Sequence, residues 1–407
     1  MKWLETLRSP TFALYAVSAW MISFLVISGS QLHNNISYLI LIVPALASLQ
    51  WAEIKRIFQN TLFRGLVLAI VSLVLSAWWN DGNPWQSLKF GLLIIVFFIA
   101  VARLPVIRED QVYKAAWGYL GLIMLYIAFN MAWFYAQGTW TPGERMGEMT
   151  SKLENVIYVT NTLGGMLAII TLLGMKARHY RAVLLAHLLV LGVSLTILQT
   201  RSIFGLWLIT ILLTYLALYR KQALHPKIRW GLLIAGISAA LSIAALFAYT
   251  SIGESLLARN FYRPEIWAGY FAETLRCGVW LGCGPDHGFQ YISHDGMVMI
   301  HPHSLYLTQF YKAGLIGLVP LLAVTLWASI QGFKAQSWAA WYFICGAFGL
   351  AFDGSSLVHS PNQRWLVFHL PLALLIAQQL HHAAQQSKLL KAGLNGQVKA
   401  KPLAESH

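Results

Sequence analysis

Long apolar runs, separated by short polar or glycine-rich breaks, follow one another along most of the chain. The hydrocarbon core of a bilayer is about 30 Å thick, so a spanning helix needs about 20 mainly apolar residues. The runs therefore predict twelve membrane-spanning helices. They cover residues 12–28, 36–50, 61–78, 86–104, 115–136, 156–175, 182–199, 202–219, 229–250, 304–330, 337–352 and 363–380. No signal-peptide cleavage site follows the first run, so we expect it to be a retained helix.

The composition supports this interpretation of the apolar runs. Of the 407 residues, 57% are hydrophobic and only 11% are charged, and the mean hydropathy is +0.58. A soluble globular domain usually has about 25% charged residues. The sequence therefore predicts an all-α integral membrane protein, with a single polytopic domain at residues 1–383. Residues 384–407 are polar, and we expect them to form a frayed cytoplasmic tail.

The basic residues indicate an orientation in the membrane. Most of the 29 Lys and Arg residues fall in the connections on the same side as the N-terminus. The positive-inside rule then predicts that both termini are cytoplasmic. The formal charge of +14 is explained by this topology. Because the basic residues are scattered over short loops and form no nucleic-acid motif, nucleic acid is not an expected partner.

The loops on the outer side carry the candidate chemistry. The inner connections are too short for a nucleotide-binding domain, and no P-loop or Rossmann glycine pattern is present. By contrast, residues 251–302 form a long outer loop between the ninth and tenth predicted helices, and loops of such length are usually functional or disordered. This loop is rich in aromatic residues and glycine, so we expect it to be ordered. Its two cysteines, Cys277 and Cys283, are compatible with a disulfide or with two free thiols.

Three positively charged or titratable side chains are predicted to meet at the outer face. Arg201 lies at the tight turn between the seventh and eighth helices, Arg263 opens an amphipathic stretch that includes Trp267, and His303 begins the tenth helix. Each has an ordinary structural alternative. An arginine at this depth often extends to the membrane interface, and a single histidine at a helix end is often structural.

The spacing after His303 favours a functional interpretation. His303 and Ser304 are followed by nine residues, then Gly314, two residues, and Gly317. Eleven residues are about three helical turns, so a helix that includes His303 would place Gly314 on the same face. We interpret this face as a groove for a lipid tail below a titratable head. The alternative is that the glycines allow close helix packing. His301 would point elsewhere on such a helix, and we assign it a supporting role.

This stretch resembles the O-antigen ligase and polymerase family of bacterial inner-membrane proteins. The family signature is His, then Asn, Ser or Gln, nine residues, Gly, two residues, and Gly, Thr or Tyr. His303, Ser304, Gly314 and Gly317 fit every position of this signature.

Other family elements also match over about residues 195–350. They are RPEIW at 263–267, the turn GCGP at 282–285, and Arg201 ahead of Gly205. The segment ENVIYVTNTLGG at 154–165 departs from the pattern, since relatives often have an Asn-Pro-Asn-like element there.

The resemblance implies a GT-C-like glycosyltransferase with a lateral cavity facing the periplasm, in the bacterial inner membrane among membrane lipids. The donor would be a glycan on undecaprenyl pyrophosphate, and the acceptor a sugar hydroxyl of the lipid A-core oligosaccharide. In that reaction His303 would be the general base, while Arg201 and Arg263 would stabilise the leaving pyrophosphate. Direct attack would invert the anomeric carbon. The expected substrate-binding residues are His301, Ser304, Gly314, Gly317 and Trp267.

No metal or other cofactor is expected. Metal-dependent glycosyl transfer usually gathers carboxylates, and no Asp-x-Asp pair occurs in the outer loops. The alternative is that acidic residues from distant loops meet in space.

Several other functions stay open at this stage. A polymerase of the same family would use two polyprenyl-linked glycans, and a protein O-oligosaccharyltransferase would usually carry an additional soluble domain. A lipid or sugar transporter is the alternative from another class. Transporters often show repeats and broken helices, and the sequence indicates neither. We therefore prefer the ligase. The sequence carries no signal for an oligomeric state.

Overall fold

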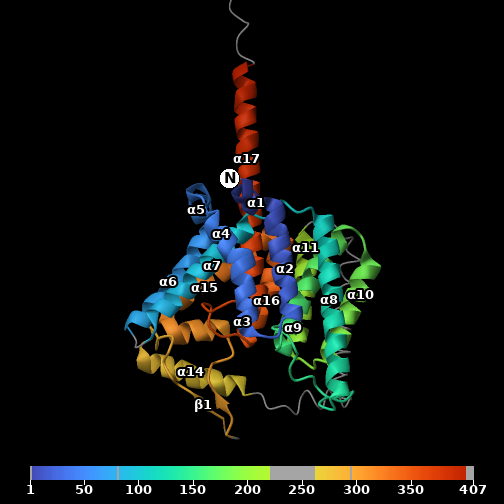
Figure 1. Ribbon diagram of the computed structural model, residues 1–407, viewed down its shortest axis with the longest axis vertical. Coiled ribbons are helices and arrows are strands. Elements are labelled where there is room, and N and C mark those ends of the chain that lie inside the picture. The colour runs from blue at the N-terminus through green and yellow to red at the C-terminus, as the bar shows by residue number, and fades with distance from the viewer. Residues whose placement is uncertain (1, 80–81, 221–261, 294–295, 400–407) are drawn as a thin grey trace, which may run out of the picture.

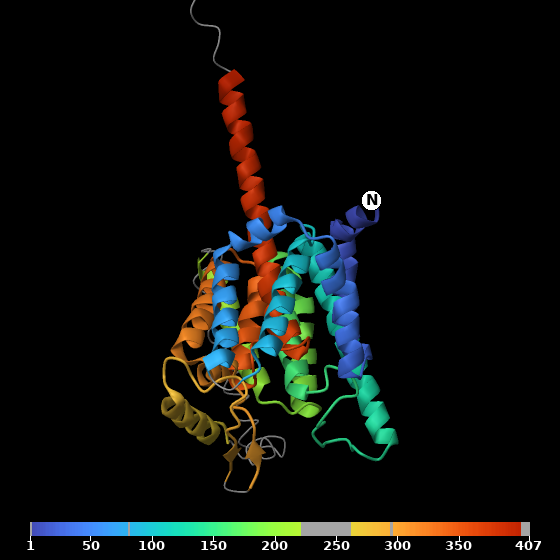
Figure 2. The same cartoon turned by 60° about the vertical axis from the view of Figure 1, so that its left-hand side comes forward.

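The computed structural model describes residues 2–79, 82–220, 262–293 and 296–399, and these residues are mostly helical. The predicted helix at 229–250 lies outside the described residues. Helix α1 (Lys2–Arg8) and the far end of α17 (Leu370–Lys399) lie at one end of the helical bundle (Figures 1 and 2). Helix α14 (Arg263–Cys277) and strand β1 (Tyr291–Ile292) lie at the opposite end, which we call the α14 end.

In the first part of the chain, two of the helices, α2 (Pro10–Val26) and α7 (Pro84–Ala102), start at N-cap side chains. Ser9 and Asn83 each accept a hydrogen bond from a backbone N–H of the first helical turn, and a proline follows each of them. The helices are α2 (Pro10–Val26), α3 (Ser30–Ser37), the π-helical η1 (Tyr38–Ile42), α4 (Val43–Ala47), α5 (Trp51–Phe58), α6 (Thr61–Trp79), α7 (Pro84–Ala102) and α8 (Glu109–Ala136).

The second part of the chain surrounds one buried helix, α9 (Val156–Lys176), which packs against α8, α10, α11 and α16. It is far more buried than the other long apolar helices, which places it at the centre of the bundle. The remaining elements are α10 (Tyr180–Thr196), α11 (Ser202–Arg220), β2 (Val298–Met299), α15 (Leu305–Lys334), α16 (Trp338–Phe352) and the π-helical η2 (Trp365–His369).

Helical structure occurs in each predicted run that the structure describes, but the lengths differ. Among the described residues, five helices are long and apolar enough to cross a membrane: α6, α7, α8, α9 and α15. Residues 30–58 form a sixth candidate, in which two helical parts meet at 106°. Helices α2, α10, α11 and α16 are apolar but shorter. The all-α membrane class is therefore supported, and the count of twelve spans stays a prediction.

Two expectations about helix continuity are wrong. Residues 384–399 continue α17 as a helix, where the sequence suggested a frayed tail (Figure 1). Helix α15 was expected to be unbroken from residue 304, yet its backbone leaves helical geometry at Gly314, with φ 59° and ψ −157°. Only glycine adopts such a conformation without strain.

A loop fills the break in α15. Four backbone hydrogen bonds join residues 279–284 to both sides of Gly314. They are Cys283 N–H to the Tyr311 carbonyl (2.7 Å), Gly284 N–H to Lys312 (3.0 Å), Leu315 N–H to Val279 (2.9 Å) and Ile316 N–H to Trp280 (3.3 Å). A Cβ on Gly314 would lie 2.2 Å from the Trp280 carbonyl oxygen. Because Gly314 has no side chain, the backbone of the 279–284 loop can contact the backbone of α15. The N–H and C=O groups that the break in the helix leaves unpaired therefore form hydrogen bonds with the loop.

Helix α14 packs on α15 over a small apolar core of its own. This core contains the buried residues Ile266, Tyr270, Cys283 and Tyr311, separate from the main core of the bundle. The Tyr270 hydroxyl lies 3.2 Å from the Phe289 carbonyl oxygen and 3.1 Å from that of Met299. Strands β1 and β2 pair antiparallel beside it, with residue 291 opposite residue 299. The outer segment is therefore ordered against the bundle over its described residues.

Candidate active site

A cavity of about 550 Å³ opens at the α14 end of the bundle. Three arginines line it, and we call it the arginine cavity: Arg145 from the loop before α9, Arg201 just before α11, and Arg263 at the start of α14. His303 and Asp353 also line it. Its apolar lining includes Ile157, Ile266, Met299, Phe348 and Phe352. The structure thus brings together Arg201, Arg263 and His303, the three residues that the sequence singled out as catalytic, from three separate segments of the chain.

His303 is held by a carboxylate that the sequence did not predict. Its Nδ1 lies 3.0 Å from Oδ1 of Asp353, the C-cap residue just after α16. The Asp353 side chain is only 7% exposed, whereas that of His303 is 31% exposed. An ionised carboxylate only accepts hydrogen bonds, so the Nδ1–H of His303 donates to Asp353. In the neutral tautomer that this contact favours, Nε2 is the nitrogen with the lone pair.

The local backbone explains the position of His303. Helix α15 begins at Leu305, after the N-cap Ser304, whose hydroxyl accepts the N–H of Leu307 at 3.4 Å. His303 itself has φ 51°, outside the helix. The expectation that His303 and Gly314 share one helical face is therefore wrong. The imidazole instead projects from a turn ahead of the helix.

The three arginines concentrate positive charge in the cavity. Partial burial is the largest cause that lowers the pKa of Arg145; Asp353 raises it, and the charges of Arg201 and Arg263 lower it again. Among the described residues, neither Arg145 nor Arg263 forms an ion pair with a carboxylate. Guanidinium groups bind phosphates through paired, charge-assisted hydrogen bonds. The arrangement suits a ligand that carries several negative charges.

His301 lies against His303, which the sequence did not predict. The two ring centroids are 4.2 Å apart, with 34° between the ring planes. They were expected to point apart, and this was wrong because both precede the helix. Burial, and then the charge of His303, lower the pKa of His301 to about 4. His301 does not line the arginine cavity, so it lies beside His303 on another side.

Trp267 holds the same turn in place. Its indole N–H donates to the Pro302 carbonyl oxygen at 2.9 Å, and its ring lies 6.1 Å from that of Phe352, centroid to centroid. Trp267 is therefore next to the cavity, although it does not line it. The contact connects α14 to the residues just before His303.

The two motif glycines lie away from the cavity. Gly314 forms the backbone contact with the 279–284 loop described above, and a Cβ on Gly317 would lie 2.9 Å from the Gln309 amide nitrogen and 3.1 Å from the Ser72 hydroxyl on α6. Both positions fit the alternative of close packing. They do not form the floor of a groove below His303.

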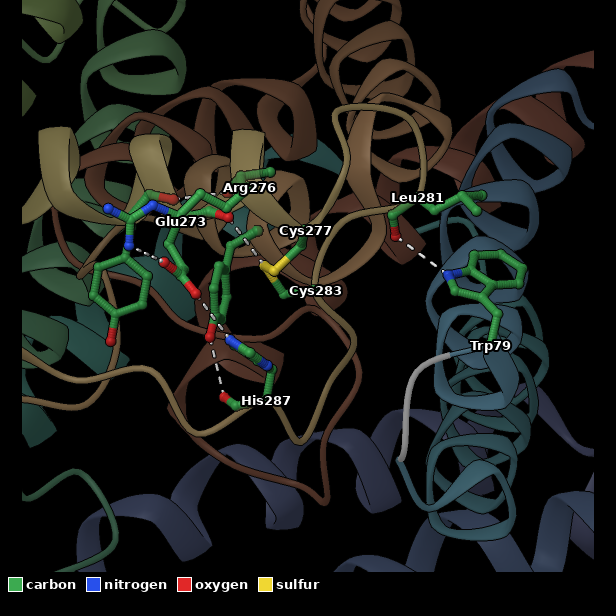
Figure 3. Close-up of a disulfide and its surroundings, with 10 residues drawn as sticks. Trp79, Glu273, Arg276, Cys277, Leu281, Cys283 and His287 are labelled. Carbon is green, nitrogen blue, oxygen red and sulfur yellow. Dashed lines mark hydrogen bonds and ion pairs between the residues drawn. A yellow bond between two sulfur atoms is a disulfide. The ribbon is translucent and has the colours of Figure 1, made fainter.

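The two cysteines of the outer segment form a disulfide (Figure 3). The Cys277 and Cys283 Cα atoms are 5.0 Å apart, so the bond closes the loop that docks on the break in α15. Glu273 lies beside it, with its carboxylate 3.1 Å from His287 Nε2 and 3.3 Å from Arg276. Cys277, Cys283 and His287 are the group with metal-ligand spacing among the described residues. Their sulfur atoms are already bonded to each other, so they offer no thiolate to a metal.

Two charged residues of the cavity, Asp353 and Arg145, were not predicted from the sequence. Asp353 had one usable signal, since an acidic residue at the end of an apolar helix is costly and often functional. Arg145 lies in the short outer loop at residues 137–155 and belongs to no motif.

These features define an integral membrane protein with a histidine–aspartate pair in a cavity lined by three arginines at one end of its helical bundle. No protein-family model matches the chain. The chain is 26% identical over 366 residues to the O-antigen ligase of Pseudomonas aeruginosa, and the match covers 85% of each protein. This relative confirms the resemblance to the O-antigen ligase family that the motifs indicated.

Proposed function

We propose that the protein is an O-antigen ligase. It would transfer a glycan from undecaprenyl pyrophosphate to a sugar hydroxyl of lipid A-core oligosaccharide, without a metal and with inversion of the anomeric carbon. The observation that carries this proposal is the position of the His303–Asp353 pair in the arginine cavity. The similarity to the Pseudomonas aeruginosa O-antigen ligase supports the class of reaction. The positive-inside pattern supports a periplasmic α14 end in the inner membrane and cytoplasmic termini.

The arginines act on the leaving group. When the bond between the anomeric carbon and the pyrophosphate oxygen breaks, its electron pair passes to that oxygen. Arg201 and Arg263, with Arg145 beside them, stabilise the negative charge that develops there. Preformed positive charge in a partly enclosed cavity supplies the stabilisation that a divalent metal gives in other glycosyltransferases.

His303 acts on the nucleophile. As the acceptor hydroxyl oxygen bonds to the anomeric carbon, Nε2 takes the hydroxyl proton, which is worth about a hundred- to ten-thousandfold in rate. The carboxylate of Asp353 keeps the proton on Nδ1 and stabilises the imidazolium that forms. Asp353 is a positioning residue, because it reaches the reaction only through His303.

The test is transfer by the purified protein. Donor glycan on undecaprenyl pyrophosphate is incubated with lipid A-core or with no second acceptor, and the products are separated on a gel. Glycan on lipid A-core, formed only when that acceptor is present, supports the ligase. Longer glycans still on the polyprenyl carrier would identify a polymerase, and the absence of both products would favour a transporter.

Two variants and a chelator make this test specific. His303→Ala removes the general base and is expected to abolish transfer, whereas His287→Ala removes an imidazole at the same end but outside the cavity and is expected to be active. EDTA is expected to leave the rate unchanged. A loss that a divalent ion restores would contradict the metal-independent mechanism, and normal transfer by His303→Ala would contradict the assignment of the base.

A further inference from the structure

Two outer segments, each of which carries an arginine of the cavity, are hydrogen bonded to each other. We call residues 140–146 the Arg145 loop and residues 197–201 the Arg201 turn. The Met146 N–H donates to the Ile197 carbonyl oxygen at 3.1 Å, and the Gln199 side-chain amide donates to the Gly143 carbonyl oxygen at 2.9 Å. The two bonds lie on either side of Arg145 in the sequence. Arg145 and Arg201 therefore belong to one hydrogen-bonded unit.

The Arg201 turn is fixed by the core of the bundle. The Thr200 and Thr160 hydroxyl oxygens lie 2.7 Å apart, and both side chains are buried. Thr160 belongs to α9, the most buried of the long apolar helices. The Thr200 N–H also donates to the Ser194 carbonyl oxygen of α10, at 3.1 Å. The turn can thus act as a rigid platform for the Arg145 loop.

The Arg145 loop has a defined shape of its own. The Trp140 indole N–H donates to the Glu144 carbonyl oxygen at 3.0 Å, and the Glu144 carboxylate accepts the N–H of Thr141 at 3.1 Å. Met146 is fully buried next to Arg145. These contacts give the loop its shape, and the bonds to the Arg201 turn join that shape to the second arginine.

Gln199 lies in a conformation that would suit glycine better. Its φ is 44°, in a region that residues other than glycine rarely adopt. Its side chain is nevertheless buried and lines the arginine cavity. Buried amides are usually hydrogen bonded, and unfavourable backbone conformations persist where the surroundings require them. The bond to the Gly143 carbonyl gives a reason for a glutamine at this turn, since glycine could not form it.

Arg145 needs such a support because like charges surround it. Partial burial lowers the pKa of Arg145, and the charges of Arg201 and Arg263 lower it further. Among the described residues, no carboxylate forms an ion pair with Arg145. A long side chain that is repelled by its neighbours loses conformational freedom when it stays in the cavity. A fixed backbone reduces the part of this cost that would otherwise fall on ligand binding.

We propose that Gln199 is a positioning residue that holds Arg145 beside Arg201, so that both guanidinium groups bind the same pyrophosphate. This inference rests on the proposed function, in which the arginine cavity binds the leaving pyrophosphate. Gln199 acts only through Arg145, and its amide donates to the Gly143 carbonyl both with and without ligand. The two arginines are then arranged before the donor arrives.

The test measures lipid binding without acceptor, so that no transfer occurs. The full-length protein in detergent is titrated with undecaprenyl pyrophosphate that carries no glycan, and with undecaprenol, which has the same tail and no phosphate. Gln199→Met keeps the length of the side chain and removes its N–H donor. It is expected to weaken binding of the pyrophosphate about tenfold, equivalent to about 1.4 kcal/mol, and to leave binding of undecaprenol unchanged.

A double-mutant cycle with Arg145→Ala shows whether Gln199 acts through that arginine. In the Arg145→Ala protein, Gln199→Met is expected to change pyrophosphate binding by less than about twofold, because the residue to be positioned is absent. The matched control is Gln363→Met. It removes an amide bond of the same kind, to the Lys152 carbonyl oxygen at 2.6 Å in the same outer connection, but outside the cavity, and it should bind both lipids like wild type.

Several results would overturn the role of Gln199. These are unchanged pyrophosphate binding by Gln199→Met, equal weakening for both lipids, or the full tenfold loss in the Arg145→Ala protein, which would mean direct contact with the ligand. An equal loss in Gln363→Met would attribute the effect to general loosening of the outer connection, and would also refute the role. If Gln199→Met unfolds at a lower temperature than wild type, Gln199→Asn repeats the cycle, because asparagine tolerates positive φ but is one methylene shorter. A wild-type protein that shows the expected binding pattern but transfers no glycan would refute the ligase function alone.

Discussion

The pair of His303 and Asp353 gives the sharpest prediction, through the substitution Asp353→Asn. Asparagine has nearly the same shape as aspartate, so the turn before α15 and the end of α16 keep their packing. The substitution removes only the negative charge 3.0 Å from His303 Nδ1. The Asp353 side chain is 7% exposed, so water replaces little of the lost interaction. The effect should therefore fall on the charged imidazolium that forms during transfer.

The size of the effect follows from the hydrogen bond that is lost. A hydrogen bond to a charged group is worth about 1.5–3 kcal/mol. At about 1.4 kcal/mol per factor of ten, this predicts a fall in kcat of about 10- to 150-fold. The carboxamide can also donate to Nδ1 and move the proton to Nε2, which removes the base. In serine proteases the corresponding substitution lowers kcat about ten-thousandfold. We therefore expect kcat of Asp353→Asn to fall by at least about tenfold and at most about ten-thousandfold.

The assay is the transfer rate at saturating donor and acceptor, with KM for the donor measured in parallel. We expect kcat to fall and KM for the donor to stay within about twofold, because the arginines are untouched. Asp110→Asn, which removes an exposed carboxylate paired with Arg108, is the control and should transfer normally. Wild-type kcat in a folded Asp353→Asn protein would refute the positioning role. So would an increase in KM with no change in kcat.

Three further predictions concern charge and backbone. Arg263→Ala should lower kcat about 10- to 150-fold through loss of a charged hydrogen bond to the leaving group, with partial recovery in Arg263→Lys; equal rates for all three proteins would exclude the role. Gly314→Ala should lower the free energy of unfolding by about 3 kcal/mol or more, because φ at this position is positive and the added Cβ would clash with the Trp280 carbonyl. The measurement is the midpoint of thermal unfolding, which should fall. Gly121→Ala, whose Cβ meets nothing within 4 Å, should be neutral or stabilising, and equal midpoints for the two alanine variants would contradict this account. Replacing Cys277 and Cys283 together by serine should lower the free energy of unfolding by about 2 kcal/mol, because the unfolded chain regains the entropy of a short closed loop. Reductant should then no longer change the midpoint of thermal unfolding. An unchanged midpoint in the variant would show that the disulfide adds no stability.

The helical class of the fold was predictable from sequence because it depends on local hydropathy. Apolar runs mark helices wherever the structure describes them, and five of these helices start at an N-cap side chain that accepts a backbone N–H: α2, α7, α9, α15 and α16. Helix lengths and breaks were less predictable. The break at Gly314 depends on a loop some thirty residues earlier that supplies hydrogen bonds to it. A count of helical turns along one segment contains no information about that partner.

The site was predictable to the extent that motifs mark it. Arg201, Arg263 and His303 meet in one cavity, as expected from their outer positions. Asp353 was missed because its partner lies fifty residues away and no motif connects them. The orientation of His301 was wrong because the helix was started too early. Ser304 is a favoured N-cap residue, and this preference would have placed both imidazoles ahead of the helix.

The closed loop between Cys277 and Cys283 bears on how the geometry of the site depends on the thickness of the bilayer. Arg263 begins α14, the disulfide joins the end of that helix to the loop, and the loop is hydrogen bonded to both halves of α15, which starts just after His303. A covalent and hydrogen-bonded path within the protein thus connects the segments that carry Arg263 and His303, two of the residues proposed to act in catalysis. Helices tilt to adapt to bilayers of different thickness. Because this path runs through the protein, we expect the separation of Arg263 from His303 to change little when the thickness of the surrounding bilayer changes.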